Sequence, residues 1–272
     1  MNKLHFVAGF PRSGSTLMCN MLNMNPDFHA TPTSPTLDMI MQMRKVFSHN
    51  ISYKNMDRLA ESERFRNGVK SYLHAYWHDK KVVFDKNRGW VNKLPIMDRI
   101  MGHQDCKVIF CYRNPVEVFQ SIESQYQKTI LMENNDESQN DLGFATLLNR
   151  VETFISQKFT LMSAPVSLLE DALNQGHGNR ILIVRYDVLC SQPQNTLDRI
   201  HEFVGEKSRK YDFTQLKQTT FENDAAYNYK FSHSIREGEV KYSPTKVNLP
   251  KTAIDMINNR FQWIINRIEK QG

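Results

Sequence analysis

Short apolar runs alternate with longer stretches of helical periodicity from residue 4 to residue 204. The apolar runs predict strands buried on both faces, and they lie at residues 4–9, 82–84, 107–112 and 181–184. Apolar residues at helical spacing predict helices at residues 15–24, 57–77, 93–102, 115–127, 143–173 and 195–204. This alternation predicts the α/β class, with a central parallel sheet flanked by helices.

Polar residues follow each predicted strand at its carboxyl end. The loop 9–16 follows the first strand, and Asp85 and Lys86 follow the second. Arg113 follows the third strand, and Tyr186 stands just beyond the fourth. Because parallel sheets bind ligands beyond the carboxyl ends of their strands, we expect these groups to form one site.

The loop after the first strand has two glycines with the spacing of a phosphate-binding loop. Its sequence is Gly9-Phe10-Pro11-Arg12-Ser13-Gly14-Ser15-Thr16. Such a loop aims successive backbone N–H groups at an anion, and the three hydroxyl side chains add donors. A glycine turn followed by a Ser/Thr helix cap is the plain structural alternative. The strand before the loop and the helix after it favour a P-loop nucleotide-binding architecture.

The loop departs from that of nucleotide triphosphatases at one position. Ser15 stands where the Gly-Lys-Ser/Thr pattern has its lysine, and the basic residue of the loop is Arg12. These features predict phosphate binding without a triphosphate–magnesium centre. Residues 82–85 end in an aspartate, as a magnesium-binding Walker B strand does, so a P-loop small-molecule kinase is an alternative hypothesis.

Composition and charge are those of an ordinary globular protein. The 272 residues are 40% hydrophobic and 24% charged, which excludes a disordered chain and a collagen-like fibre. The net charge of +6 comes without a dense Lys/Arg run, which favours an anionic ligand and predicts no nucleic-acid partner. No repeat or linker divides the sequence, so we expect a single domain over residues 1–272.

The cysteines favour a reducing compartment, and the histidines give no indication of a metal site. The four cysteines form no Cys-x-x-Cys pair, so we expect reduced thiols and a cytoplasmic protein. The nine histidines lack metal-ligand spacing, so no metal site is expected. No apolar run approaches the roughly 18 residues that cross a bilayer, so we expect no membrane span in this chain.

Two motifs resemble the nucleotide-binding elements of sulfotransferases that use PAPS (3′-phosphoadenosine 5′-phosphosulfate). The segment 6–18, FVAGFPRSGSTLM, resembles the loop that binds the 5′-phosphosulfate, as found in the bacterial and tyrosylprotein branches. The segment 108–121, VIFCYRNPVEVFQS, resembles the element that binds the 3′-phosphate. The resemblance implies that the nucleotide is bound by Pro11, Arg12, Ser13, Gly14, Ser15, Thr16, Arg113 and Ser121.

Three further segments resemble parts of the same family. The resemblance implies that Tyr186 lies near the nucleotide and that Ser234 and Lys246 are additional nucleotide ligands. The segment 84–88, FDKNR, resembles the one that supplies a catalytic lysine, which is Lys86 here.

The resemblance implies transfer of a sulfuryl group from PAPS to a hydroxyl acceptor, whose class the sequence does not specify. The products are a sulfate ester and PAP (3′-phosphoadenosine 5′-phosphate). Cations and backbone amides stabilise the leaving phosphate, so no metal is required and Arg12 and Lys86 are the catalytic candidates. A non-catalytic nucleotide-binding protein is the second alternative hypothesis, and the oligomeric state stays open.

The base that activates the acceptor is the least determined part of the site. The tyrosylprotein branch has a glutamate about 21 residues after the loop arginine, and that distance reaches Thr33 here. The nearby candidates are His29, whose residue type titrates near neutrality, and Asp38. Asp85 is a further candidate, although neighbours on a strand point to opposite faces and Asp85 adjoins Lys86.

Overall fold

Five parallel strands form one sheet in the order β2-β3-β1-β4-β5. The computed structural model describes residues 3–77, 79–129, 146–158, 160–223, 233–245 and 247–269. The strands are β1 (Lys3–Gly9), β2 (Phe28–Ala30), β3 (Val82–Lys86), β4 (Val108–Tyr112) and β5 (Ile181–Arg185). The predicted α/β class and parallel sheet are confirmed. The edge strand β2 was not predicted, because three residues are too few to show a pattern.

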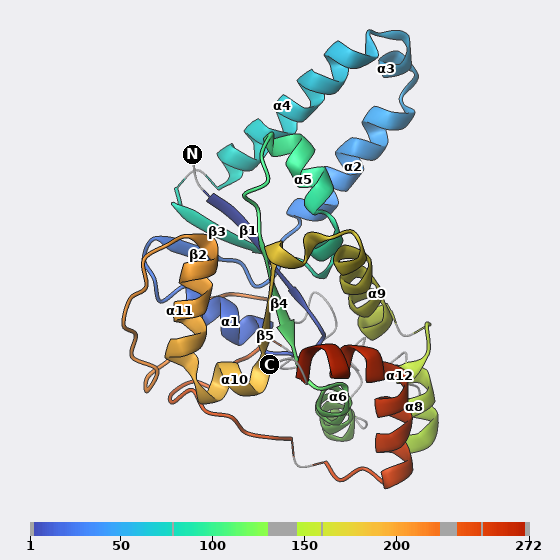
Figure 1. Cartoon of the computed structure of the whole chain (residues 1–272), viewed down its shortest axis with the longest axis vertical. Coiled ribbons are helices and arrows are strands. Elements are labelled where there is room, and N and C mark those ends of the chain that lie inside the picture. Colours follow the sequence, from blue (N-terminus) through green and yellow to red (C-terminus); the bar gives the residue numbers. More distant parts are fainter. Residues whose placement is uncertain are drawn as a thin grey trace.

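Helices cover both faces of the sheet (Figure 1). One face carries α1 (Ser15–Leu22), α10 (Tyr186–Ser191) and α11 (Pro193–Val204). The other carries α5 (Leu94–Met101), α6 (Pro115–Thr129), α8 (Leu147–Ile155), α9 (Thr160–Asn174) and α12 (Lys251–Glu269). Two short 3₁₀ helices, η1 (Arg88–Asn92) and η2 (His177–Arg180), precede α5 and β5.

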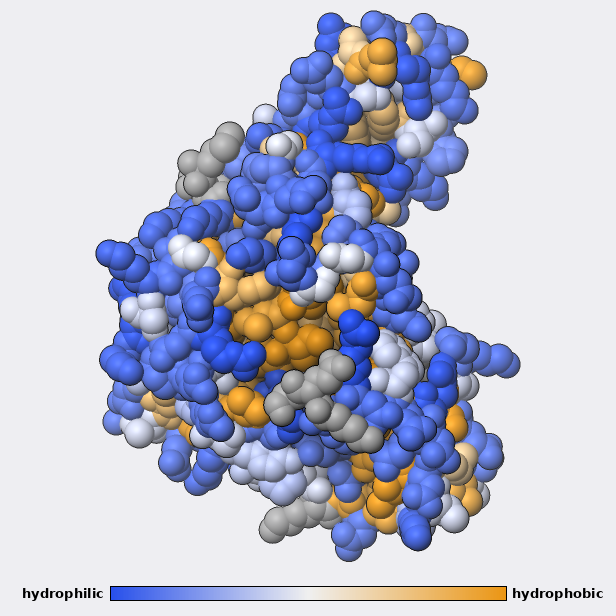
Figure 2. Space-filling view, viewed as in Figure 1, coloured by the Kyte–Doolittle hydropathy of each residue, from blue (hydrophilic) through white to orange (hydrophobic). Residues whose placement is uncertain are grey.

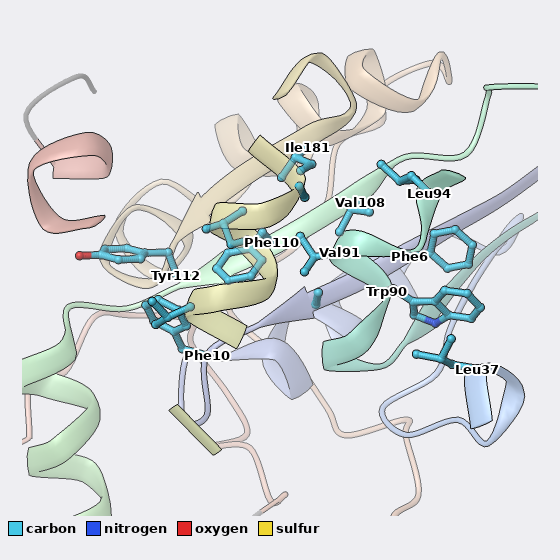
Figure 3. Packing of buried hydrophobic residues seen from close by; sticks show 14 of the residues in the cluster. Phe6, Phe10, Leu37, Trp90, Val91, Leu94, Val108, Phe110, Tyr112 and Ile181 are labelled. Atoms are coloured by element: carbon cyan, nitrogen blue, oxygen red, sulfur yellow. The ribbon is translucent and has the colours of Figure 1, made fainter. Parts of the chain in front are cut away.

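The alternation of side chains along the strands divides the core into two clusters. In β1, Phe6 and Ala8 belong to the cluster under α5 and α9, whereas Val7 belongs to the cluster under α1 and α11. In the first cluster the Phe6 ring stacks on Trp90 of η1 at 4.0 Å between centroids (Figure 3). Both faces of the central strands are therefore buried, which explains their continuous apolar sequence.

The sequence predicts one helix over residues 143–173, and the structure shows two helices there. Helix α8 ends at Ile155, because Ser156 adopts extended backbone angles (φ −75°, ψ 157°), and α9 begins at Thr160. Residues 143–145 lie outside the described part. The break lets α8 pack against α12 while α9 packs against η1. The other five predicted helices are confirmed, with ends that differ by a few residues.

A helical arm extends beyond the sheet (Figure 1). It consists of α2 (Thr36–His49), α3 (Ile51–Asn55) and α4 (Arg58–Tyr76), of which only α4 was predicted. The side chains of Asn50 and Asp57 accept hydrogen bonds from backbone N–H groups and cap α3 and α4. In the described part of the chain, no helix has both the length and the apolarity to cross a membrane.

Hydrophobic residues also gather in a hollow of the surface over the strands β4 and β5 (Figure 2). In β5, Leu182 and Ile183 are half-buried. This partial exposure follows from the edge position of β5, which has one neighbouring strand, β4. All four cysteines are free and buried, as expected of reduced thiols.

Candidate active site

The loop between β1 and α1 curls tightly at the carboxyl end of the sheet. Gly9 and Gly14 have φ values of 144° and 82°, and Arg12 has a φ of 55°. A Cβ on Gly9 would lie 2.3 Å from the carbonyl oxygen of Cys111 in β4, so this position needs glycine. The Ser13 hydroxyl donates to the Phe10 carbonyl at 2.7 Å and fixes the turn. The sequence therefore folds here into the loop that its glycine spacing predicts.

Two arginines connect this loop to β4 and α6. Nε of Arg12 donates to the Ser121 hydroxyl of α6 at 3.2 Å. Arg113, just after β4, donates from Nη1 to the carbonyl of Arg12 at 3.1 Å and from Nε to Glu117 at 3.0 Å. The two residues of the predicted 3′-phosphate pair, Arg113 and Ser121, thus both contact the loop.

An aromatic ring closes the loop from the side of β5. The guanidinium of Arg113 lies 4.5 Å from the ring centroid of Tyr186, the first residue of α10. A Cβ on Gly14 would come within 2.6 Å of the same ring. Burial raises the pKa of the Tyr186 phenol, so this hydroxyl stays protonated over the working pH range. Loop, arginine and tyrosine therefore form one packed unit.

Asp85 and Lys86 point to opposite faces of β3. Asp85 is fully buried and accepts hydrogen bonds from the Ser34 hydroxyl at 2.6 Å and from Nε1 of Trp90 at 2.7 Å. Burial raises the pKa of Asp85, and these hydrogen bonds act against it. On the opposite face burial lowers the pKa of Lys86, and the neighbouring Arg88 lowers it further. Lys86 therefore faces the loop, whereas Asp85 anchors the core.

These elements enclose a cavity of about 360 Å³ at the carboxyl end of the sheet. Its wall contains most of the residues that the sequence singles out, namely Pro11, Arg12, Ser13, Gly14, Ser15, Thr16, Lys86, Arg113, Ser121, Tyr186 and Ser234. Because Arg12, Lys86 and Arg113 are cationic, the cavity suits a ligand with several negative charges.

Comparison with known proteins identifies the family. The family model described as a sulfotransferase domain matches residues 3–262. The chain belongs to the sulfotransferase family. The nodulation protein NoeE of Sinorhizobium fredii (strain NBRC 101917 / NGR234) is 24% identical over 233 residues, which are 79% of this chain and 53% of that protein. The chain thus spans about half the length of this curated relative.

Solved sulfotransferases share the fold at low sequence identity. The sulfotransferase domain from the curacin biosynthetic pathway superposes with a TM-score of 0.56 at 16% identity, covering 97% of this chain and 98% of that one. A mouse sulfotransferase complexed with PAP gives 0.55 at 14% identity, covering 97% and 85%. A sulfotransferase from Alicyclobacillus acidocaldarius gives 0.51 at 12% identity, covering 100% and 95%.

Three of the candidates, His29, Asp38 and Asp85, do not line the cavity, and a fourth lies outside the described residues. His29 is in the edge strand β2, with its ring 5.4 Å from that of Trp77, and it does not line the cavity of this sulfotransferase-family chain. Burial lowers the pKa of His29, and Lys80 lowers it further. Lys246 lies outside the described residues. Lys86, a candidate through the family resemblance, lines the cavity, whereas His29, a candidate through its position in the sequence, does not.

The structure adds residues that the sequence analysis did not assign. Arg88 and His233 line the cavity, and the Thr245 hydroxyl accepts from Nη2 of Arg113 at 3.4 Å. Glu117 accepts from Arg113 and also from the Tyr242 hydroxyl at 2.7 Å. Arg113 lies two residues before α6 and Glu117 in its first turn, and this spacing of four residues was a usable signal. His233 and Thr245 lie in irregular segments that give no periodicity.

Metal-ligating residue types stay apart in the described ranges. No group of three or more His, Cys, Asp or Glu side chains comes together there in a metal-binding arrangement.

Proposed function

We propose that this chain transfers a sulfuryl group from PAPS to a hydroxyl acceptor, with a sulfate ester and PAP as products. The observation that carries the proposal is the convergence of Arg12, Lys86 and Arg113 on one cavity with the phosphate loop. PAPS carries a 3′-phosphate and a 5′-phosphosulfate on its ribose, and three cationic side chains, Arg12, Lys86 and Arg113, line the cavity. The residues present therefore fit this donor.

The loop and the two arginines would bind the nucleotide. Gly14 lets the loop backbone approach Tyr186 closely, and α1 has no side chain of its own capping its first turn. Its N–H groups are thus left for the 5′-phosphosulfate. Arg113 and Ser121 would hold the 3′-phosphate, which uses binding energy remote from the reacting bond.

Lys86 would stabilise the negative charge that develops on the leaving 5′-phosphate. Its side chain lines the cavity from the face of β3 that carries the loop. A cation fixed in a partly desolvated site stabilises a transition state more strongly than one in water. Arg12 would share this role, because its guanidinium is held beside the loop by Ser121.

The kinase hypothesis receives less support from the same geometry. Asp85, the residue that would imitate a Walker B aspartate, is fully buried on the other face of β3 and its carboxylate is engaged by Ser34 and Trp90. Ser15 also replaces the lysine that a triphosphate site needs.

Thermal unfolding with nucleotides tests the proposal. PAP at 100 times its dissociation constant is expected to stabilise the chain by about 2.7 kcal/mol in the presence of EDTA. Stabilisation by ATP with magnesium, and none by PAP, would support the kinase instead. Release of PAP from labelled PAPS, measured over a panel of phenols, alcohols and sugars, then separates an enzyme from a non-catalytic nucleotide-binding protein.

A further inference from the structure

The outer end of the helical arm exposes apolar side chains. Among the residues that the structure describes, eight large hydrophobic side chains are exposed, and half of them lie between residues 46 and 59. The exposed fraction is 73% for Ile51 and 84% for Leu59. Figure 2 shows hydrophobic residues on the otherwise hydrophilic outer end of the arm. We call residues 44–59 the arm tip, and its exposed apolar residues are Val46, Ile51, Met56 and Leu59.

The arm tip has a small aromatic core of its own. The ring of Phe47, which is buried, stacks on Phe65 of α4 at 4.5 Å between centroids. Tyr53 of α3 packs against the same ring at 4.9 Å, and the guanidinium of Arg58 lies 5.3 Å from its centroid. These contacts tie α2, α3 and α4 together. The exposed apolar side chains lie outside this core, so they are available to a partner.

The charge of the arm tip is positive. It contains four basic residues and one acidic residue, which give a net charge of +3. The acidic residue, Asp57, accepts hydrogen bonds from backbone N–H groups and caps α4. Basic residues interleaved with exposed apolar ones are typical of segments that lie in the interface of an anionic bilayer. The basic residues are all exposed and are Arg44, Lys45, Lys54 and Arg58.

The shape and position of the arm tip favour a bilayer over other anionic partners. The arm extends beyond the sheet with α3 at its end, so the tip can meet a flat surface before the rest of the molecule does (Figure 1). Its apolar side chains project outward, and a fluid lipid phase surrounds such projections without needing a matching groove. A nucleic acid would use the basic residues but would gain nothing from Ile51 and Leu59.

We propose that the arm tip binds the surface of an anionic lipid bilayer. The four apolar side chains enter the boundary between headgroups and acyl chains, and the four basic side chains contact the anionic headgroups. Apolar area buried in lipid and attraction to the headgroups then both contribute to the affinity. This inference goes beyond the proposed sulfotransferase function and does not depend on it.

Binding of the full chain to vesicles tests the proposal. One set of vesicles contains phosphatidylcholine mixed with phosphatidylserine, and the other contains phosphatidylcholine alone. In cosedimentation we expect the mixed vesicles to bind wild type about 10-fold more tightly or better, since each basic residue near an anionic surface contributes about fivefold. Salt at about 1 M should remove most of this difference, because the Debye length falls to about 3 Å. Equal affinity for both vesicles, or binding to neither, would overturn the proposal.

Matched substitutions separate insertion from adsorption by charge alone. Leu59→Ser changes an exposed leucine in the first turn of α4, and Leu148→Ser changes an exposed leucine in the first turn of α8, away from the arm. We expect Leu59→Ser to weaken binding to the mixed vesicles by about 10-fold or more and Leu148→Ser to match wild type. Lys54→Gln is expected to weaken it by about fivefold. Loss in Lys54→Gln with wild-type affinity in Leu59→Ser would contradict insertion.

Fluorescence reports directly on the environment of the inserted side chain. The emission of Ile51→Trp, after subtraction of the wild-type spectrum, should move to shorter wavelength with the mixed vesicles, because the indole leaves water. Leu148→Trp is the control and should show no such shift. Size-exclusion chromatography covers the other occupant of the arm tip. If wild type is a dimer, Leu59→Ser is a monomer and neither binds vesicles, the arm tip is an interface between two copies and the proposal is wrong.

Discussion

Replacing Gly14 by alanine tests whether the loop and Tyr186 work as one nucleotide-binding unit. The φ of 82° at Gly14 costs an alanine about 1–2 kcal/mol. The new Cβ would lie 2.6 Å and 2.9 Å from two ring carbons of Tyr186, and displacing a packed ring costs about 1–3 kcal/mol. We therefore expect Gly14→Ala to lower the free energy of unfolding by about 2–5 kcal/mol.

Gly176 provides a matched control. It has the same φ of 82°, no atom lies within 4 Å of the point that a Cβ would occupy, and it does not line the cavity. Gly176→Ala thus carries the backbone strain alone, about 1–2 kcal/mol, which corresponds to a fall in Tm of about 2–8 °C for a chain of this size. The difference between the two variants isolates the contact with Tyr186.

Nucleotide affinity gives the decisive measurement. Moving the Tyr186 ring removes the support under the Arg113 guanidinium, which lies 4.5 Å from its centroid. Loss of one charge-assisted hydrogen bond to the nucleotide costs about 1.5–3 kcal/mol, or roughly 10- to 150-fold in the dissociation constant of PAP. Calorimetry below the Tm of each variant is expected to show this loss for Gly14→Ala and a change within twofold for Gly176→Ala. Equal PAP affinity in both variants would refute the reasoning.

Three other substitutions test separate parts of the site and the core. Arg113→Ala should weaken PAP binding by roughly 10- to 150-fold in calorimetry, and adenosine 5′-phosphosulfate much less; equal losses would assign Arg113 to holding the Arg12 carbonyl alone. Lys86→Ala should keep PAP affinity within a few-fold and lower turnover by about 10²-fold. Because the pKa of Lys86 is lowered, wild-type turnover should decrease at high pH sooner than deprotonation of an ordinary lysine would cause. Lys86→Arg should move this decrease to higher pH, and an unchanged pH profile of turnover would contradict the role of Lys86. Burial lowers the pKa of His5 to about 3, so the unfolded chain takes up a proton below pH 6.5 and stability falls by about 2 kcal/mol from pH 7 to 5; urea unfolding should show that His5→Leu loses this slope.

The parallel sheet and the phosphate loop could be predicted because their signals are local. Continuous apolar runs mark strands buried on both faces, and the spacing of Gly9 and Gly14 marks the loop, in which both glycines adopt positive φ. The arm could not be predicted in full, because α2 and α3 bury too few residues to show a clear apolar pattern. The cap of α3 by Asn50 is a short-range sequence signal of low specificity. The break at Ser156 was missed for a related reason, because the apolar spacing continues across it.

The gathering of Arg113 and Tyr186 around the loop could be predicted from topology, whereas Ser121 was indicated only by the family resemblance. In a parallel sheet the carboxyl ends of neighbouring strands meet, whatever their separation in sequence. The alternation of side chains along β3 likewise indicated that Asp85 and Lys86 face apart, as the structure places them. What topology could not supply was the partner of each side chain, such as the contact of Arg113 with the Arg12 carbonyl.

The general base shows where counting along a sequence loses its physical basis. Proton transfer requires a basic group at a point in space beside the acceptor oxygen, and the chain can supply it from any segment that passes there. Spacing from the loop arginine leads to Thr33, whose hydroxyl cannot serve as such a base. His29, which precedes Thr33 closely in sequence, does not line the cavity, whereas His233 lines it from an irregular segment that no local pattern marks. Candidates for the base can therefore be chosen only from the side chains that the fold brings to the cavity.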